Sequence, residues 1–368
     1  MKTYFFYTAL CLLISYNAPC QVIHFVFTSD VHYGITRPHF RGKDSVRASV
    51  VNDAEVNAIN GIVKEKFPAD DGIEAGKAVA YIDDIVITGD IANRQEPPVQ
   101  SAGASWKEFL HDYKNGIKTQ DAGGKQTGLF LVPGNHDASD AIGFTKTLQP
   151  VHDASSMAGI YTLMSGKTIS PEEYNYQKDK INFTRTLGSL HLFFLNIWPD
   201  SANRIWMEAQ LSHIPGNEPV LIFAHDPPDG DPKHFTNPNG QHDINATDKF
   251  ENLLEEVYKD TDVKSTEAEQ KGWTGFLQKH PNIKAYFHGH NNYSEMYTYT
   301  GPHKEVSLPV FRADSPMKGR FSQPDETRLS FDLVSIDLAS HTMTVRECFW
   351  NKDGGKTLSW GEQRTINL

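Results

Sequence analysis

Cysteine is scarce in this chain, with three in 368 residues. Cys11 and Cys20 lie within the first twenty residues, which leaves Cys348 alone in the rest of the chain. A single cysteine cannot form an internal disulfide, and we expect Cys348, in the run VRECFW, to be a buried strand residue. The stability of the fold must therefore come from packing, assisted by a metal ion if suitable ligands converge.

A hydrophobic run long enough to span a bilayer is missing from the N-terminus, where residues 4–14 form a short apolar stretch. This stretch follows Lys2 and precedes small and polar residues, as in a secretory signal peptide. We expect cleavage after residues 1–20, leaving one domain of residues 21–368 without an integral membrane segment. Lipid attachment at Cys20 is the alternative. Both interpretations predict an exported protein, periplasmic or extracellular.

Basic residues are in the minority, because 35 Lys and Arg stand against 46 Asp and Glu, for a formal net charge of −11. Removing residues 1–20 takes away only Lys2, which moves the charge to −12. Proteins that depend on a nucleic-acid backbone need clustered cations. The composition therefore predicts no nucleic-acid partner. It does not determine the oligomeric state.

Apolar runs that end in polar residues recur along the chain and are typical of buried strands. Five of them lie at residues 22–30, 84–90, 128–137, 219–226 and 283–290. Helical spacing is present in residues 45–66 and 104–113, and a hairpin is expected around Gly188. Further strands are expected at residues 309–314, 328–337 and 342–350. Strands that alternate with helices before a β-rich end favour a mixed α/β sandwich.

Two segments, residues 138–180 and 227–247, are rich in Pro, Gly, Asn and Asp. We predict that both are long surface loops. His234 and His242, in the second segment, are interpreted as surface histidines, although either lies close enough in sequence to border a site after residue 225.

Five strand-like runs stop at side chains that bind metals. The five groups are Asp30-Val31-His32, Gly89-Asp90, Gly134-Asn135-His136-Asp137, Ala224-His225-Asp226 and Gly289-His290-Asn291-Asn292. The carboxyl ends of strands in open α/β sheets form the edge where ligands bind. One such group arises readily by chance, and a lone His is more often a hydrogen-bonded structural residue. Five in order indicate a metal site at the carboxyl ends of the strands.

This ordered set resembles the calcineurin-like metallophosphoesterase superfamily, whose pattern is D-x-H, G-D, G-N-H-D, H and G-H-x-H. The resemblance spans residues 22–295 and is close except in the last motif. It implies a four-layer α-β-β-α sandwich, in which two mixed sheets pack face to face with helices outside. It also implies two metal ions held over the strand ends.

The resemblance assigns the ligands residue by residue. Asp30 and His32 would bind the first ion, and Asp90 would bridge both. The second ion would be completed by Asn135, His225 and His290. Imidazoles and carboxylates suit Fe, Zn or Mn, and the lack of a thiolate argues against iron–sulfur chemistry. Two ions roughly 3.5–4 Å apart can share a hydroxide, lower its pKa and hold a phosphate for in-line attack.

The last motif can be aligned in two ways. Alignment on Gly289 makes His290 a ligand of the second ion and puts Asn292 in place of the usual final His on the first. Alignment on the histidines would instead pair His288 with His290, with Phe287 in place of the glycine. We prefer the first alignment, because glycine permits close approach of the backbone to the site.

By the same resemblance, His136 is a non-ligand catalytic residue that stabilises the transition state or protonates the leaving oxygen, and Asp137 orients it and raises its pKa. A structural role is the alternative for His136. Arg94 occupies the position of a phosphate-contacting Arg in serine/threonine protein phosphatases, with a solvated loop Arg as its alternative. Asn93 stands where purple acid phosphatases carry a metal-binding Tyr, which disfavours that subgroup.

The sequence thus predicts an exported dinuclear metal-dependent phosphoesterase acting on a small-molecule phosphate mono- or diester. Within this class, a phosphodiesterase for lipid head groups, similar to sphingomyelinases, is an alternative. An exported binding protein that keeps the metals without catalysis is a second. A nuclease is disfavoured by the net charge of about −12.

Overall fold

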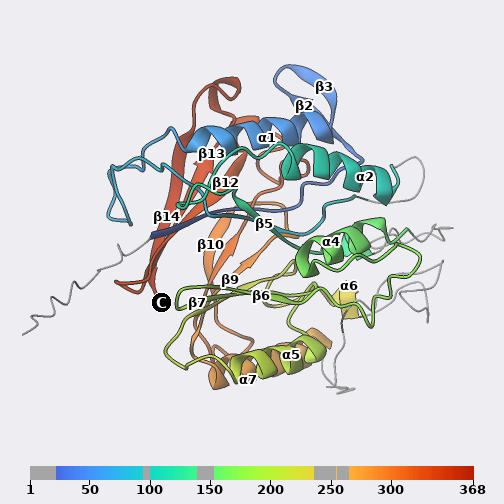
Figure 1. The fold of residues 1–368 in the computed structure, drawn as a ribbon, viewed down its shortest axis with the longest axis vertical. Coiled ribbons are helices and arrows are strands. Elements are labelled where there is room, and N and C mark those ends of the chain that lie inside the picture. The colour runs from blue at the N-terminus through green and yellow to red at the C-terminus, as the bar shows by residue number, and fades with distance from the viewer. Residues whose placement is uncertain (1–21, 94–99, 139–152, 236–253, 255–264) are drawn as a thin grey trace, which may run out of the picture.

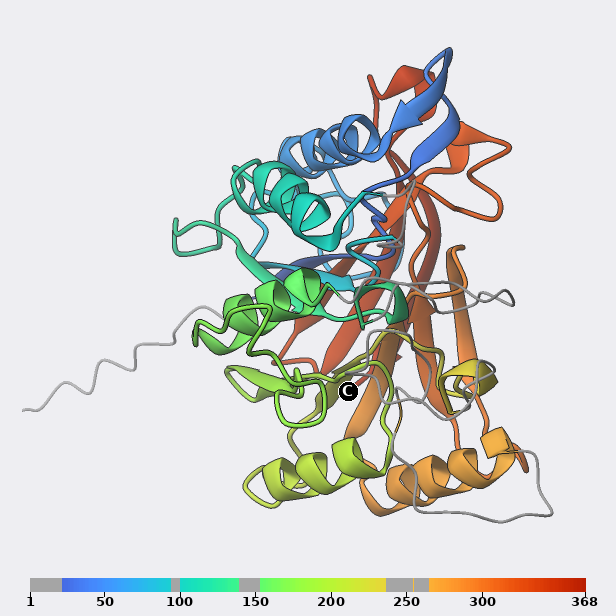
Figure 2. The ribbon, with the colours of Figure 1, turned by 90° about the vertical axis from the view of Figure 1, so that its right-hand side faces the viewer.

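The computed structural model describes residues 22–93, 100–138, 153–235, 254 and 265–368. Two six-stranded sheets pack face to face, and helices cover their outer faces (Figures 1 and 2). The predicted four-layer α/β sandwich of two mixed sheets is confirmed. None of the helices in these residues is long and apolar enough to cross a membrane.

The first sheet joins the N-terminal and C-terminal parts of the described chain. Its strands are β1 (Val22–Thr28), β4 (Asp84–Thr88), β5 (Gly128–Val132), β12 (Ser330–Asp337), β13 (Thr342–Phe349) and β14 (Ser359–Asn367). Their order is β14-β13-β12-β1-β4-β5. β1, β4 and β5 are parallel, whereas β12, β13 and β14 pair antiparallel. Cys348 is buried on β13, as predicted.

The second sheet is built from the middle of the chain. Its strands are β6 (Phe183–Leu187), β7 (Leu190–Phe194), β8 (Val220–Phe223), β9 (Ile283–His288), β10 (Glu295–Tyr299) and β11 (Leu308–Arg312). Their order is β10-β11-β9-β8-β7-β6, with β7, β8, β9 and β11 parallel. β6 and β7 form the predicted hairpin, whose turn contains Gly188 at a positive φ of 63°.

Helices form the two outer layers. They are α1 (Ala48–Ile62), α2 (Ala102–Phe109) with its π-helical extension η1 (Leu110–Lys114), α3 (Asn135–Ala138), α4 (Ser155–Ser165), α5 (Ser201–Leu211), α6 (Pro232–Phe235) and α7 (Ser265–Lys279). α1 and α2 lie over the first sheet and α5 and α7 over the second (Figures 1 and 2). Short 3₁₀ turns are η2 (Glu326–Arg328) and η3 (Lys352–Gly354).

Three sequence predictions of elements need correction. The described part of the loop expected over residues 227–247 contains α6 (Pro232–Phe235). The helix expected from residue 45 begins at Ala48, because β2 (Thr36–Phe40) and β3 (Lys43–Arg47) form a small hairpin just before it. The loop expected over residues 138–180 contains α4, whose buried Met157, Ile160 and Met164 join the core. Apolar packing therefore stabilises a helix in a segment whose composition favoured a loop.

Aromatic side chains fill the space between the sheets. Phe25 on β1 lies with its ring centroid 5.7 Å from that of Phe223 on β8. Phe27, two residues further on the same face of β1, lies 5.2 Å from Phe287 on β9. Phe223 and Phe287 stack on each other at 4.8 Å. These contacts bring the carboxyl ends of β1, β8 and β9 to the same edge of the sandwich.

A buried carboxyl group lies beneath this edge, on α1. Glu55 accepts hydrogen bonds from the Thr28 hydroxyl at 2.7 Å and from the Tyr113 hydroxyl at 3.1 Å. Burial raises the pKa of Glu55 to about 7, against the lowering effect of these two hydrogen bonds. Folding therefore favours the protonated form of Glu55.

This raised pKa makes stability depend on pH. Below its unfolded pKa, Glu55 is protonated in both states and does not lower the free energy of unfolding. As pH rises from there to the folded pKa of about 7 and above, ionisation of Glu55 destabilises the fold by up to about 3 kcal/mol. We expect Glu55→Gln to unfold at a higher denaturant concentration than wild type at pH 8, with a smaller difference at pH 5. Asp53→Asn, an exposed acid on the same helix, is the control. Equal pH profiles for wild type and Glu55→Gln would contradict this role.

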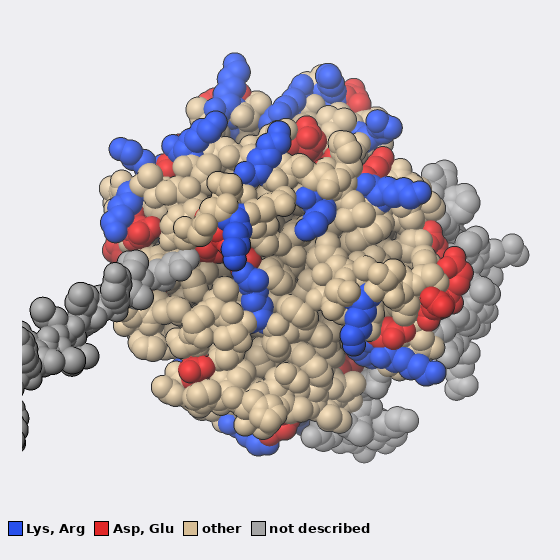
Figure 3. Space-filling model, viewed as in Figure 1, with Lys and Arg blue, Asp and Glu red and all other residues tan. Residues whose placement is uncertain are grey.

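Charged side chains are mixed on the face of the molecule seen in Figure 3. Lys and Arg side chains are spread apart there, with Asp and Glu among them. On the part of this face formed by described residues, no continuous basic strip of the kind that follows a nucleic-acid backbone is visible.

Candidate metal centre

The first group of site residues lies where β1 and β4 end. The Nε2 atom of His32 is 3.6 Å from Oδ1 of Asp30 and 3.7 Å from Oδ2 of Asp90. All three side chains are buried. Asp30, His32 and Asp90 have positive φ angles, which turn the chain sharply after each strand and direct these side chains toward one another.

The second group comes from the ends of β5, β8 and β9. Nε2 of His225 is 2.9 Å from Oδ1 of Asn135, and Nδ1 of His290 is 3.1 Å from the same oxygen. The two imidazole nitrogens are 3.2 Å apart. Oδ1 of Asp90 is 3.5 Å from Nε2 of His225, while its Oδ2 faces His32. Asp90 therefore presents one oxygen to each group.

Hydrogen bonds outside the cluster orient both imidazoles of the second group. Nδ1 of His225 donates to the Thr88 carbonyl at 2.7 Å, which leaves Nε2 facing the cluster. Nε2 of His290 donates to Oδ2 of Asp231 at 2.9 Å, which leaves Nδ1 facing the cluster. Asp231 was not expected from the sequence. Its only signal is that it lies six residues after His225, in the polar run HDPPDGD.

We expect Asp231 to strengthen metal binding through His290, as carboxylates behind ligating imidazoles commonly do. Asp231→Ala should lower the affinity for one ion by about 10–100-fold, and Asp231→Asn, which still accepts a hydrogen bond, by less. Competition with a chromophoric chelator measures both values. Asp53→Asn is the charge-matched control. Unchanged affinity in Asp231→Ala would show that Asp231 does not act through His290.

Negative charge is concentrated at the centre of the site. Ligand atoms of Asp30, Asp90 and His225 all lie within 4.8 Å of one another. Burial raises the pKa of Asp90 well above its usual value, and the charges of Asp30 and Asp137 raise it further. Buried carboxylates so close together are stable as anions only if cations lie between them.

The alignment on Gly289 agrees with the geometry. A Cβ atom at Gly289 would lie 1.9 Å from Oγ of Ser29 and 2.1 Å from Oδ2 of Asp30, so a larger residue would displace these side chains. The backbone N–H of His290 donates to the same Asp30 oxygen at 2.9 Å. The imidazole of His288 lies away from the cluster, where Nε2 is 2.9 Å from the Tyr297 hydroxyl.

This geometry predicts opposite results for the two histidines. His290→Ala should lose one of two bound ions, because it removes an imidazole that faces the cluster. His288→Gln, which keeps a polar atom near Tyr297, should retain both. Metal content per folded chain after dialysis measures the difference. Loss of an ion from His288→Gln would overturn the glycine alignment.

A comparison of the sequence with family models places the site among known proteins. The model for calcineurin-like phosphoesterases matches residues 23–292, a span that contains all five strand ends. The chain belongs to the calcineurin-like phosphoesterase family. The chain is therefore a hydrolase of phosphoester bonds. Its His and Asp residues are of the types that bind metals in this family. No curated protein matches the chain in sequence.

Three of the solved structures that match are only weakly similar to this phosphoesterase. A single mutant of Vps29 from Entamoeba histolytica is 9% identical, with a TM-score of 0.32, 94% of this chain covered and 100% of that chain. Vps29 of Chaetomium thermophilum is 9% identical, with a TM-score of 0.34 and coverages of 94% and 95%. Phosphopantetheinyl hydrolase of Mycobacterium tuberculosis is 10% identical, with a TM-score of 0.32 and coverages of 81% and 93%. The family assignment rests on the family match and the site.

The residues of this phosphoesterase fit the ions that its family implies. Oδ1 of Asp30 and Oδ1 of Asn292 are buried without a hydrogen-bond partner, although buried acceptors are normally paired. The Asn292 Nδ2 donates to the His290 carbonyl at 2.9 Å, which holds the side chain in place. A cation in the first group would satisfy both acceptors. Carboxylate, imidazole and amide ligands suit Fe, Zn or Mn.

His136 and Asp137 have different positions in the phosphoesterase site. Nε2 of His136 lies 4.0 Å from Oδ2 of Asp90, and its ring meets that of His32 edge to face at 5.4 Å. The expected hydrogen bond between the Asp137 carboxylate and the His136 ring is not present. The Asp137 carboxylate instead accepts four hydrogen bonds, from the backbone N–H groups of Ile91, Ala92 and Gly134 and from the Ser156 hydroxyl.

Asp137 thus links the loops after β4 and β5 by hydrogen bonds. These loops carry Asp90 and Asn135, so Asp137 helps to hold both residues in position. Geometry excludes the predicted role beside the His136 ring, because both carboxylate oxygens point toward backbone amides. Arg94, predicted to contact phosphate, and His242 lie outside the described residues. His234 was expected at the surface but is buried, with Nδ1 2.6 Å from Oδ2 of Asp226.

Proposed function

We propose that this chain is a dinuclear metal-dependent phosphoesterase that hydrolyses a small phosphate mono- or diester. The observation that carries the proposal is the position of Asp90, whose two oxygens face two separate groups of ligands. Asp30, His32, Asp90 and Asn292 would hold one ion, and Asp90, Asn135, His225 and His290 the other. When bound, the ions would supply Lewis acidity and lower the pKa of water.

The side chains of the protein would hold the ions in place and supply the proton for the leaving group. Asp90 keeps the two ligand groups together, and the backbone N–H of His136 donates to its Oδ1 at 2.9 Å. Hydrolysis forms a bond from a water oxygen to phosphorus and breaks the bond to the leaving oxygen, which must gain a proton. Nε2 of His136 borders the cluster on the Asp90 side and is the group we propose to deliver that proton.

Two measurements test this function. Metal analysis of the protein loaded with Fe, Zn or Mn should give two ions per chain. The loaded protein should hydrolyse p-nitrophenyl phosphate, bis(p-nitrophenyl) phosphate or both, and the ratio separates a monoesterase from a diesterase. If neither ester is hydrolysed by protein that holds two ions, the chain is the non-catalytic binding protein and the proposal is wrong.

A phosphodiesterase is favoured by one further feature, the polar cavity of about 440 Å³ that shares His290 with the site. A diester has a second substituent on phosphorus, and a cavity of this size beside the ligands can hold it. Lipid head groups are one source of such diesters.

We also propose export, from the layout of residues 1–20, which lie outside the described residues. Expression in a host with a secretory pathway should release a chain of residues 21–368 that begins with Gln21, as mass spectrometry would show. Incorporation of labelled fatty acid that Cys20→Ala abolishes would indicate lipid attachment instead. Retention of residues 1–20 in the purified protein would contradict both forms of export.

A further inference from the structure

A polar cavity opens directly beside the second group of metal ligands. Six of its lining residues define what we call the acidic pocket: Asp229, Asp231, Tyr293, Glu295, Tyr297 and Arg312. His290 lies between this cavity and the cluster, because its Nδ1 faces Asn135 of the cluster and its Nε2 faces Asp231 of the pocket. Its volume of about 440 Å³ accommodates a substituent of several heavy atoms.

The only cation among the six defining residues is already paired. Arg312 forms a salt bridge with Glu295 and donates from Nε to the Tyr293 carbonyl at 3.0 Å. Its guanidinium carbon lies 3.4 Å from the centroid of the Tyr293 ring, and its side chain is only 6% exposed. Arg312 is therefore part of the wall, and its charge is balanced there by Glu295.

The pocket has two further carboxylates. Asp231 is paired with Nε2 of His290 at 2.9 Å, and Asp229 is exposed at the pocket. The six defining residues carry three carboxylates against one guanidinium, and the imidazole of His290 faces one of the three, so Asp229 is the carboxylate paired with neither Arg312 nor His290. A phosphate group is repelled from such a pocket, whereas a positively charged group next to the phosphate is attracted.

The aromatic wall adds a second source of attraction. Tyr297 is held in place by the hydrogen bond between its hydroxyl and His288 at 2.9 Å. A fixed aromatic ring beside carboxylates is a favourable environment for an alkylammonium group, which is attracted to both.

We propose that the acidic pocket binds a cationic substituent, a primary amine or a quaternary ammonium, of the phosphate ester hydrolysed at the adjoining metal centre. This substrate class rests on the proposed function. The phosphate lies at the cluster, and the alkylammonium group lies near Asp229.

A matched pair of diesters tests the charge alone. p-Nitrophenyl phosphorylcholine and p-nitrophenyl 3,3-dimethylbutyl phosphate have nearly the same shape, but only the first carries a positive charge. We expect kcat/KM for the choline ester to be on the order of tenfold higher at low salt, with the ratio falling as salt screens the carboxylates.

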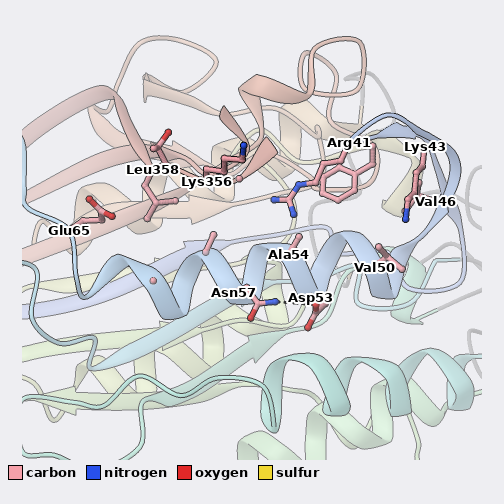
Figure 4. A pocket seen from close by; sticks show the side chains of 15 residues that line it. Arg41, Lys43, Val46, Val50, Asp53, Ala54, Asn57, Glu65, Lys356 and Leu358 are labelled. Carbon is pink, nitrogen blue, oxygen red and sulfur yellow. Dashed lines mark hydrogen bonds between the residues drawn. The ribbon is translucent and has the colours of Figure 1, made fainter. Parts of the chain in front are cut away.

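Two variants locate the effect. Asp229→Asn should lower the ratio toward one, because it removes the exposed carboxylate without touching His290 or its hydrogen bond to Asp231. Asp53→Asn should leave the ratio unchanged. Asp53 lines a separate cavity of about 430 Å³ on α1, shown in Figure 4, which shares no lining residue with the acidic pocket.

A binding measurement separates this inference from the proposed function. Calorimetry on metal-loaded protein should show tighter binding of phosphocholine than of 3,3-dimethylbutyl phosphate, and Asp229→Asn should reduce the difference. If phosphocholine and 3,3-dimethylbutyl phosphate bind equally, and the two diesters have equal kcat/KM, the proposed cationic substituent is wrong. Hydrolysis of bis(p-nitrophenyl) phosphate would then still support a phosphoesterase. Selective binding without hydrolysis of any ester would support the pocket and overturn the proposed function.

Discussion

Asp90→Asn should lose the metal pair and lower kcat/KM for phosphate esters by at least about 10³-fold. The two oxygens of Asp90 face His225 at 3.5 Å and His32 at 3.7 Å, so the change removes the shared anionic ligand from both groups at once. Asparagine has nearly the same shape and can still accept the backbone hydrogen bond from His136. Metal analysis after dialysis and steady-state kinetics measure the two losses.

The same substitution should stabilise the metal-free protein. Burial and the charges of Asp30 and Asp137 raise the pKa of Asp90, so its ionised form opposes folding at neutral pH. Asp90→Asn removes this penalty, which in wild type grows as pH rises above the unfolded pKa and through the raised folded one. We expect a higher Tm than wild type in chelator at pH 7, and a lower one with metal. Two tightly bound ions in Asp90→Asn would contradict the bridging role.

His136→Ala should keep both ions and lose hydrolysis, with a fall that depends on the leaving group. The imidazole lies 4.0 Å from Asp90 and is not one of the proposed ligands, so metal content should not change. General acids typically contribute 10²–10⁴-fold. We expect a loss of this size for alkyl esters, whose leaving oxygens need a proton, and a much smaller loss for p-nitrophenyl esters.

His136→Gln is the matched variant, because glutamine hydrogen-bonds but is not a general acid. It should behave like His136→Ala toward alkyl esters. An equal fall for alkyl and p-nitrophenyl esters, or loss of a metal ion, would assign His136 to positioning of the site instead of proton delivery.

Much of the site could be predicted because it follows strand ends. Asp30, Asp90 and His225 each lie two residues after the end of a buried strand, and parallel strands bring such positions to one edge of a sheet. The preferred alignment of the last motif also depended on a local property. Gly289 is required because the Asp30 carboxylate and Ser29 hydroxyl occupy the space that a Cβ atom would need.

The partners of the site residues could not be predicted in the same way. Asp137 follows His136 directly, and adjacency suggested a hydrogen bond that the turn into α3 does not allow. Asp231 and His234 lie in a polar run whose composition resembles that of a surface loop. Both contact residues of the site because the loop after β8 folds back over the end of β9.

The sequence by itself determined the alternation of strands and helices, the types of metal ligand and their order along the chain. These depend on periodicity and on residues next to each strand end, which are local properties. Tertiary structure alone decided which nitrogen of each imidazole faces the cluster, what Asp137 holds in place, and the acidic pocket beside His290. Each of these depends on contacts between side chains far apart in sequence, which exist only once the two sheets have packed.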